Sequence, residues 1–194
     1  MNTIQLNTIL EQDRYVGPIF RGVYPIDQLP TIRDGAYVIN TAPHNHEGLH
    51  WLAILIKNDN IEYFDSYGGE PPAKLLRWGK KKQWTINPVQ LQSPLTSVCG
   101  QYCIYYLFHR ARGIDLRILL NDFGSDVDDN DKLVYDFVED RYELVVPTMI
   151  DTNKVISQLA QAQVSDPSIR KIASGQLFCS SPHSKMCHSS EDWI

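Results

Sequence analysis

The stretch "HWLAILIKNDNIEYFDS", residues 50–66, decides the fold because it contains two short apolar runs separated by a brief polar turn. Residues 50–57 and 61–66 are rich in Ile, Leu and aromatic side chains, a composition typical of strands. Three polar residues between them are few enough for a β-hairpin. We therefore expect two adjacent antiparallel strands, and counting out from the turn places Asp65 within side-chain reach of His50.

The rest of the chain predicts further strands and several helices around this hairpin. Strands are expected over 35–41 and 83–91, whereas residues 17–30, interrupted by Gly and Pro, are expected to form a loop. Helices are expected over 4–12, over 71–80, from Cys99 towards Gly113, from a cap at Asn130 or Asp131, and over 151–164. The order predicts an α+β fold with a small, mostly antiparallel sheet flanked by helices.

Length and composition fit one globular domain. The chain has 194 residues, of which 43% are hydrophobic and 21% are charged, and we expect one domain over 1–178 with a loose tail over 179–194. The first residues lack the basic flank and apolar stretch of a secretion signal, and no apolar run is long enough to cross a bilayer. We therefore expect a soluble intracellular protein whose four cysteines are reduced thiols.

Charge is unevenly distributed along the chain. Residues 121–150 carry nine acidic and two basic residues; because the whole chain has a net charge of −5, the remainder carries about +2. Two basic groups stand out: Lys74, Arg77, Lys80, Lys81 and Lys82, and then Arg110, Arg112 and Arg117. A solvated face is the simplest interpretation, with a local DNA-binding patch as the alternative.

The stretch "QSPLTSVCGQYC", residues 92–103, places Cys99 where a polar loop meets a helix. A helix N-terminus lowers the pKa of a thiol, and a neighbouring imidazolium lowers it further. Among the six histidines, His50 is best placed to supply the imidazole, because His109 lies too far along the helix that begins at Cys99. Asp65 would orient this imidazole, and the Cys99 N–H with the Gln92 amide could stabilise an oxyanion.

The other cysteines have less specific surroundings. Cys103 lies one helical turn after Cys99; the spacing is one residue longer than that of a redox Cys-x-x-Cys pair, so we expect it in the core. Four residues of the tail have spacings that could hold zinc, with a disordered tail as the alternative: Cys179, His183, Cys187 and His188.

Three motifs in order, "GLHWLAILI", "YFDSYG" and "QSPLTSVCGQYCIYYL", resemble the adenain family of adenovirus cysteine proteases and, more distantly, the SUMO- and ubiquitin-like-protein proteases. The resemblance covers roughly residues 15–112. It implies a nucleophile at the N-terminus of a central helix and hydrolysis of peptide or isopeptide bonds, commonly after glycine. The roles that it implies are as follows: Cys99 as nucleophile, His50 as general base and acid, Asp65 as its orienting group, Gln92 as oxyanion donor, and Trp51 as a shield of the site.

One departure from the family concerns activation. Adenain is activated by DNA and by a peptide that forms a disulfide with a cysteine located between the acidic residue and the nucleophile, but residues 66–98 contain no cysteine here. The resemblance therefore leaves activation by DNA or by a noncovalently bound peptide, and no cofactor is required.

The function expected from the sequence is that of a cysteine endopeptidase that processes precursor polyproteins or capsid-type proteins of a virus or virus-like element. Its location would be the virion or host nucleus if viral, and the cytoplasm otherwise, without a membrane partner. Two alternatives remain open: a protease that removes a ubiquitin-like modifier, and a catalytically inactive binding module.

Overall fold

The structure, a computed structural model, describes residues 1–142. Its elements in chain order are α1 (Thr3–Gln12), the short 3-10 helix η1 (Gly17–Ile19), β1 (Phe20–Pro25), β2 (Gly35–Asn40), β3 (Trp51–Lys57), β4 (Asn60–Phe64), α2 (Ala73–Trp78), β5 (Gln83–Ile86), α3 (Cys99–Ala111), α4 (Leu116–Leu120) and α5 (Val127–Tyr142). The helix expected over 151–164, the tail over 179–194 and the domain boundary at 178 lie outside the described residues.

Five strands form one sheet in the order β1-β2-β3-β4-β5. The hairpin expected over residues 50–66 is present, with Ala53 opposite Phe64, and β2 also runs antiparallel to β3. The two outer pairs, β1 with β2 and β4 with β5, are parallel. The α+β class is thus confirmed, but the sheet is mixed rather than mostly antiparallel, because longer connections return the chain to the same end of the sheet at both edges.

The loop expected over 17–30 was wrong in its middle, where the structure has β1. Its register shifts between Phe20 and Gly22, and Gly22 has a φ of 119°, which a residue with a side chain rarely adopts. Pro25 ends the strand. Since β1 is an edge strand, it tolerates both a bulge and a proline, which explains why its sequence has the punctuation of a loop.

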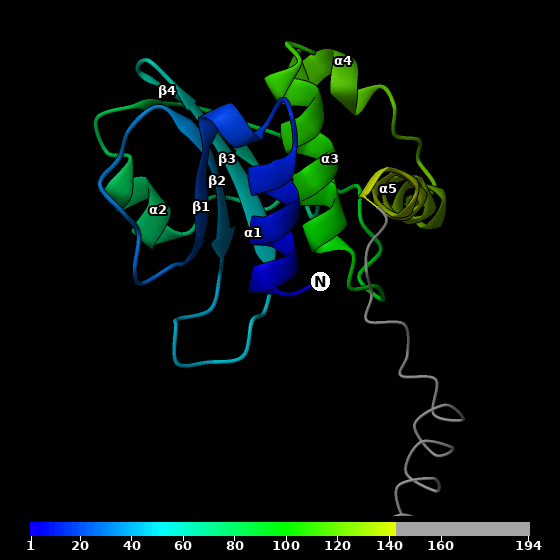
Figure 1. Ribbon diagram of the computed structural model, residues 1–194, viewed down its shortest axis with the longest axis horizontal. Coiled ribbons are helices and arrows are strands. Elements are labelled where there is room, and N and C mark those ends of the chain that lie inside the picture. Colours follow the sequence, from blue (N-terminus) through cyan, green and yellow to red (C-terminus); the bar gives the residue numbers. More distant parts are fainter. Residues whose placement is uncertain (143–194) are drawn as a thin grey trace, which may run out of the picture. The chain divides into compact units, whose positions relative to one another are not determined.

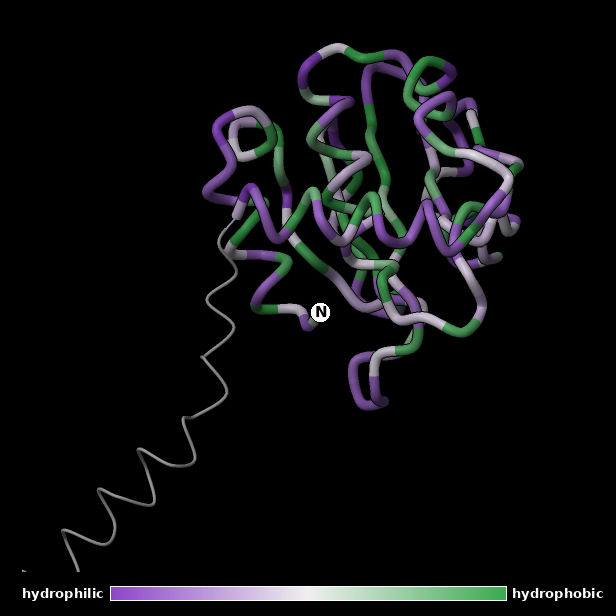
Figure 2. Tube along the Cα trace, turned by 90° about the vertical axis from the view of Figure 1, so that its right-hand side faces the viewer, coloured by the Kyte–Doolittle hydropathy of each residue, from purple (hydrophilic) through white to green (hydrophobic). Residues whose placement is uncertain are grey.

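Both faces of the sheet are covered. Figure 1 shows α1 and α3 on one side of the strands and α2 on the other. Val38 and Ala53 belong to the core under α1 and α3, whereas their neighbours Ile39 and Leu52 belong to a second core with Leu75 of α2. Side chains alternate along a strand, so the two cores come from the same strands. Hydrophobic stretches lie mainly inside the fold in Figure 2.

Helix α3 is the centre of the fold. It packs against β3 and against α5, and residues from Gly100 to Phe108 are all buried. A helix that is enclosed on all sides holds its ends in fixed positions. The first of those positions belongs to Cys99.

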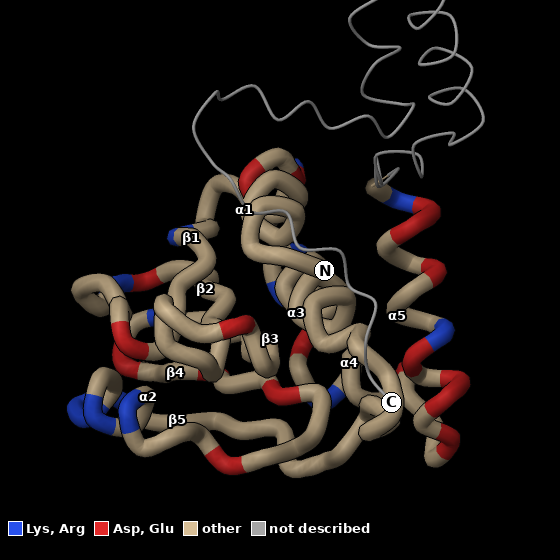
Figure 3. Tube along the Cα trace, turned by 90° about the horizontal axis from the view of Figure 1, so that it is seen from below, with Lys and Arg blue, Asp and Glu red and all other residues tan. Residues whose placement is uncertain are grey.

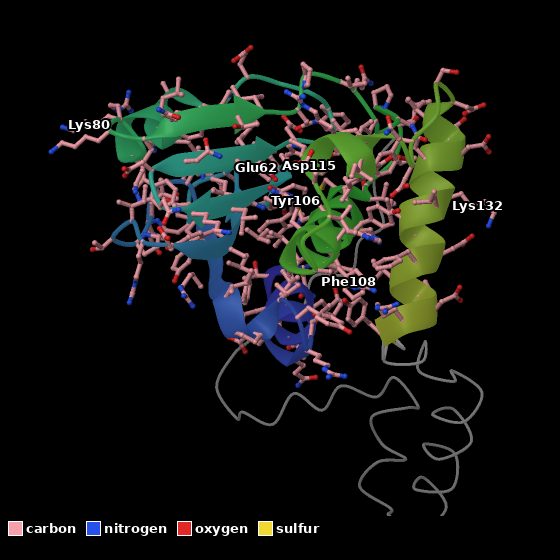
Figure 4. The ribbon with its side chains drawn as sticks, turned by 90° about the horizontal axis from the view of Figure 1, so that it is seen from above. Glu62, Lys80, Tyr106, Phe108, Asp115 and Lys132 are labelled. Carbon is pink, nitrogen blue, oxygen red and sulfur yellow. The ribbon has the colours of Figure 1, made fainter. Side chains whose placement is uncertain are left out.

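A buried ion pair fastens the other end of α3 to the sheet. Arg110 Nη2 donates to Glu62 Oε2 of β4 at 3.0 Å, and Arg110 Nε donates to Glu62 Oε1. The Tyr106 hydroxyl also donates to Glu62 Oε1, at 2.8 Å, and Figure 4 shows these two residues side by side. Arg110 is therefore committed to Glu62, which removes it from the basic groups considered for DNA.

Helix α5 begins earlier than expected, at Val127. Asp126 acts at its start, where its Oδ1 accepts a hydrogen bond from the Asp128 N–H at 2.9 Å. Asn130 and Asp131, expected to cap the helix, lie inside it and are buried. Among the described residues, no helix has the length and apolar character needed to span a membrane.

Candidate active site

The predicted hairpin brings His50 and Asp65 together. His50 directly precedes β3, Asp65 directly follows β4, and His50 Nε2 lies 2.7 Å from Asp65 Oδ1. Both side chains are largely buried, with 14% and 9% of their surfaces exposed. Because Nε2 is bound to the carboxylate, Nδ1 is the ring nitrogen left to face another group.

The Asp65 carboxylate is itself held in place by its surroundings. Its Oδ1 also accepts the N–H of Tyr67 at 2.9 Å, and its backbone N–H and C=O are bonded to the side chain of Asn87, each at 2.8 Å. The turn that follows requires Gly68, which has a φ of 66° and leaves no space for a Cβ beside Val89. The carboxylate is thus fixed before any substrate binds.

Cys99 is half-buried at the first position of α3, and His50 lies close enough to lower the pKa of its thiol. Burial raises the pKa of the Cys99 thiol, but hydrogen bonding to His50 and to the N–H groups of Trp51 and Gly100 lowers it by more, so the net shift of this pKa is downward. Burial lowers the pKa of His50, yet its bonds to Asp65 and Cys99 raise it to about 9. The two shifts favour a thiolate and an imidazolium side by side.

The start of α3 also offers unpaired donors. Val98 occupies the cap position, and it has no side-chain oxygen to accept the first N–H groups of the helix. The N–H of Cys99 is one of these groups, and no acceptor is bonded to it among the described residues. A developing oxyanion beside Cys99 could accept from it.

Gln92 lies fully buried in the loop between β5 and α3. Its Oε1 accepts from Ser66 Oγ at 2.7 Å, and its Nε2 donates to the Thr96 carbonyl at 3.0 Å. The Thr96 carbonyl can only accept, so it fixes which end of the amide is the donor, and the nitrogen end faces the segment that leads to Cys99. No hydrogen bond joins Gln92 to Cys99 or His50 within the described part of the chain.

Two residues at the site were missed by sequence reasoning. The Tyr67 ring stacks on His50 with 4.7 Å between ring centroids, and nothing in its turn-like context signals this role. Asp131 binds the loop that carries Gln92, through Ser93 and Thr96. Its position could have been found, because it shares helical spacing with the buried Val134 and Val138 rather than with the exposed acidic residues.

A cavity of about 510 Å³ reaches Trp51, the neighbour of His50, but none of Cys99, His50, Asp65 and Gln92 lines it. Trp51, which follows His50, forms part of its lining, together with Met1, Tyr24, Asn40, His44 and His46. The Trp51 indole N–H donates to the Met1 carbonyl at 3.2 Å, and Met1 also lies against Gly100, the neighbour of Cys99. Trp51 thus lies between the cavity and the hydrophobic core under α1 and α3, on the side where Cys99 is located.

The other cysteine and histidine residues that the structure describes do not belong to the site formed by Asp65, His50 and Cys99. Cys103 is buried in the core, as expected, and burial raises its pKa, so it is a poor nucleophile. His109 lies at the far end of α3, and His44 is paired with Asp27 at 2.7 Å. The described residues contain no cluster suited to a metal ion, and the Cys and His residues of the tail lie outside them.

Similarity to known proteins covers part of the chain. The chain is 32% identical over 91 residues to a protein of African swine fever virus named SUMO-1 cysteine protease, an alignment that covers 39% of this chain and 32% of the relative. Another isolate's protein, named cysteine protease, aligns with the same identity and coverage. The chain spans about a third of the length of these curated relatives. The resemblance expected from the motifs, to viral and SUMO-type cysteine proteases, is confirmed.

A crystal structure of the African swine fever virus protease superimposes with a TM-score of 0.49 at 17% identity, covering 67% of this chain and 63% of that one. No model of a protein family matches the chain.

Proposed function

We propose that this protein is a cysteine endopeptidase in which Cys99 is the nucleophile. The observation that carries the proposal is that His50, hydrogen-bonded to Asp65, lies beside Cys99 at the start of a buried helix and lowers the pKa of its thiol. The similarity to viral cysteine proteases supports the same reaction. All four residues expected from the sequence therefore have assigned roles: Cys99, His50, Asp65 and Gln92.

The proposed reaction begins with attack of the Cys99 thiolate on the carbonyl carbon of the scissile bond. The oxygen takes up negative charge, which the Cys99 N–H and the Gln92 amide stabilise. His50 then gives its proton to the leaving amine, and a thioester remains on Cys99. Water, deprotonated by His50, hydrolyses the thioester and restores the thiolate, while Asp65 keeps the imidazole oriented throughout.

We propose protein substrates, because the relatives that the chain resembles are named cysteine proteases. We propose that an extended peptide segment enters the cavity beside Trp51, which is large enough for a few residues, and that cleavage follows glycine in precursor or capsid-type proteins. A second candidate is removal of a ubiquitin-like modifier, which the SUMO-1 in the name of one relative favours. Both reactions would use the same four groups.

The test is cleavage of a peptide library by the wild-type protein beside Cys99→Ala and His50→Ala. We expect cleavage to be lost in Cys99→Ala and reduced by several orders of magnitude in His50→Ala. The control is Cys103→Ala, which removes the neighbouring thiol from the same helix. Cleavage that persists in Cys99→Ala would exclude the mechanism. A wild-type Cys99 that fails to react with a thiol-directed electrophile would instead favour the inactive binding module.

The two substrate classes are separated by single-turnover assays. The protein is mixed with Gly-containing peptides in one series and with a modifier joined to lysine through Gly-Gly in the other. The endopeptidase proposal predicts cleavage of the peptides at rates at least equal to those of the modifier conjugates. Turnover of the conjugates alone would establish the second candidate.

A further inference from the structure

The loop that carries Gln92 has no regular secondary structure from Asn87 to Val98, so individual hydrogen bonds hold its shape. The N–H groups of Leu91 and Gln92 both donate to the Ser66 carbonyl, at 2.8 and 3.0 Å, and side chains supply the other bonds. Its two ends are β5 and the start of α3. Gln92 lies near the middle of this segment, and Cys99 follows its end. Any group that fixes the loop therefore also fixes the donor relative to the nucleophile.

Asp131 of α5 is the charged group that reaches this loop from outside. The Thr96 hydroxyl donates to Asp131 Oδ2 at 2.6 Å, and the Ser93 N–H lies 3.3 Å from the same oxygen. The Tyr102 hydroxyl of α3 lies 2.9 Å from Asp131 Oδ1. With 6% of its surface exposed, Asp131 is a buried carboxylate whose partners come from the loop and from the helix of the nucleophile.

Thr96 connects this carboxylate to the oxyanion donor. Its hydroxyl is bound to Asp131, while its carbonyl accepts from Gln92 Nε2 at 3.0 Å. Ser66 holds the opposite end of the same amide at 2.7 Å. The Gln92 amide is thus held by Ser66, which follows β4, and by Thr96, which is bonded to α5. Loss of either hydrogen bond would let the amide rotate.

The charge of Asp131 also reaches the other half of the site. It contributes, after burial and Cys99, to raising the pKa of Tyr67, whose ring stacks on His50. A carboxylate whose charge reaches the site opposes a developing oxyanion, and donors bonded to that carboxylate weaken this effect. Ser93, Thr96 and Tyr102 supply three such donors.

We infer that Asp131 is a positioning residue, which acts through Thr96 to hold the Gln92 amide where the oxyanion forms. This inference rests on the proposed function. It assigns a part in the reaction to α5, which lies beyond the residues that resemble adenain. Asp131 touches neither the thiol nor the substrate, so its effect is on the orientation of the donor.

The experiment compares Asp131→Asn and Thr96→Val with wild type, using peptide hydrolysis and alkylation of Cys99 by iodoacetamide. Alkylation needs the thiolate but no oxyanion donor, and mass spectrometry reads it at Cys99 alone. We expect kcat to fall by about tenfold or more in both variants, with KM and the alkylation rate nearly unchanged. Thr96→Ser, which keeps the hydroxyl, should restore most of kcat.

Two controls make the outcome decisive. Asp140→Asn removes the same charge from an exposed position of the same helix and should leave kcat unchanged. Combining Asp131→Asn with Thr96→Val should cost little more than either change alone, because both act through one hydrogen bond.

An unchanged kcat in Asp131→Asn and Thr96→Val would overturn the inference. A parallel fall of kcat, alkylation rate and melting temperature would also overturn it, because it would indicate a general loss of stability. Neither outcome bears on the proposed function, which fails separately if Cys99→Ala still cleaves peptides.

Discussion

At the scale of single residues, the site depends on the opposite pKa shifts of two neighbours. Hydrogen bonding to His50 lowers the pKa of the Cys99 thiol despite its burial, and the bonds to Asp65 and Cys99 raise the pKa of His50 to about 9 despite burial. Each charge thus depends on the other. His50 stays protonated as the pH rises towards 9, and Cys99 stays a thiolate as the pH falls below the ordinary pKa range of a thiol.

This coupling predicts the pH dependence of Cys99 alkylation. Reactivity should be present above the lowered pKa of Cys99 and lost as pH falls through it. In His50→Ala the midpoint should move upward, because the hydrogen bond and charge that lower the pKa are gone while burial remains. Iodoacetamide alkylation from about pH 4 to 10, measured at Cys99 by mass spectrometry, gives both curves. This range covers ordinary side-chain pKa values of roughly 4 to 10.

The matched control for this measurement is His44→Ala, which removes another carboxylate-paired imidazole, the one bonded to Asp27. Its curve should coincide with that of wild type. Identical midpoints for wild type and His50→Ala would contradict the assignment of His50 as the partner of Cys99.

The residues that sequence reasoning identified and those it missed differ in how they reach the site. His50 and Asp65 belong to one hairpin, so a short count across a turn was enough to pair them. Cys99 was marked by its place at a helix start. Asp131 comes from a separate helix through tertiary packing, and its acidic neighbours made it resemble part of a solvated face. The sequence pattern therefore predicted the contact between residues that are close together in the chain.

At the scale of elements, the position of α3 is the main structural requirement. Cys99, its first residue, must stay beside the start of β3. Near the other end of the helix, Arg110 is bonded to Glu62 of β4. Apolar packing along Gly100–Phe108 supplies the rest. A helix that is packed along its length and fastened near its C-terminus holds the nucleophile at its first position in place.

We predict that Arg110→Ala lowers the free energy of unfolding by about 3 kcal/mol, because it leaves the Glu62 carboxylate buried without its partner. Urea denaturation followed by tryptophan fluorescence measures the change. Arg117→Ala, an exposed arginine of α4, is the control and should have little effect. Replacing Glu62 and Arg110 together by leucine should recover part of the loss; equal stability of Arg110→Ala and Arg117→Ala would contradict this account.

The strand order shows where sequence patterns lose information at this scale. The ladder between β3 and β4 was predictable, because a short hairpin turn joins two apolar runs, whereas the pairing of β2 with β3 spans the longer connection 41–50 and was not predicted. β1 was not predicted either, since a glycine at a φ of 119° and a terminal proline gave an edge strand the composition of a loop. The parallel pairing of β4 with β5 depends on the path of α2 between them, which no local pattern encodes.

At the scale of the whole molecule, charges of opposite sign lie on different elements. Figure 3 shows basic residues gathered at α2 and acidic residues along α5. Arg110 is bonded to Glu62, and the Arg112 guanidinium lies over the rings of Tyr15 and Phe108. Arg117 is a single exposed arginine, so the proposal that DNA stimulates peptide cleavage depends mainly on the cluster around α2, from which Lys80 projects in Figure 4.

DNA is expected to raise the rate of peptide cleavage at low salt and to lose this effect as salt rises, because phosphate contacts release counterions. The triple substitution Lys74→Gln, Lys80→Gln, Lys81→Gln should abolish the stimulation without changing the rate in the absence of DNA. Neutralising three acidic residues of α5, Asp128, Asp129 and Asp140, is the matched control and should not abolish it. A rate that DNA leaves unchanged at low salt would exclude DNA as an activator.

The proposed mechanism requires that Cys99 forms a thioester with the substrate. The most direct measurement is rapid acid quenching during turnover of a peptide ester ending in glycine, followed by mass analysis of the protein. We predict a mass increase equal to the acyl part of the substrate, located at Cys99 by fragmentation and absent in Cys99→Ala. Turnover that proceeds at the same rate in Cys99→Ala, with no acyl group on Cys99 of the wild-type protein, would contradict the account.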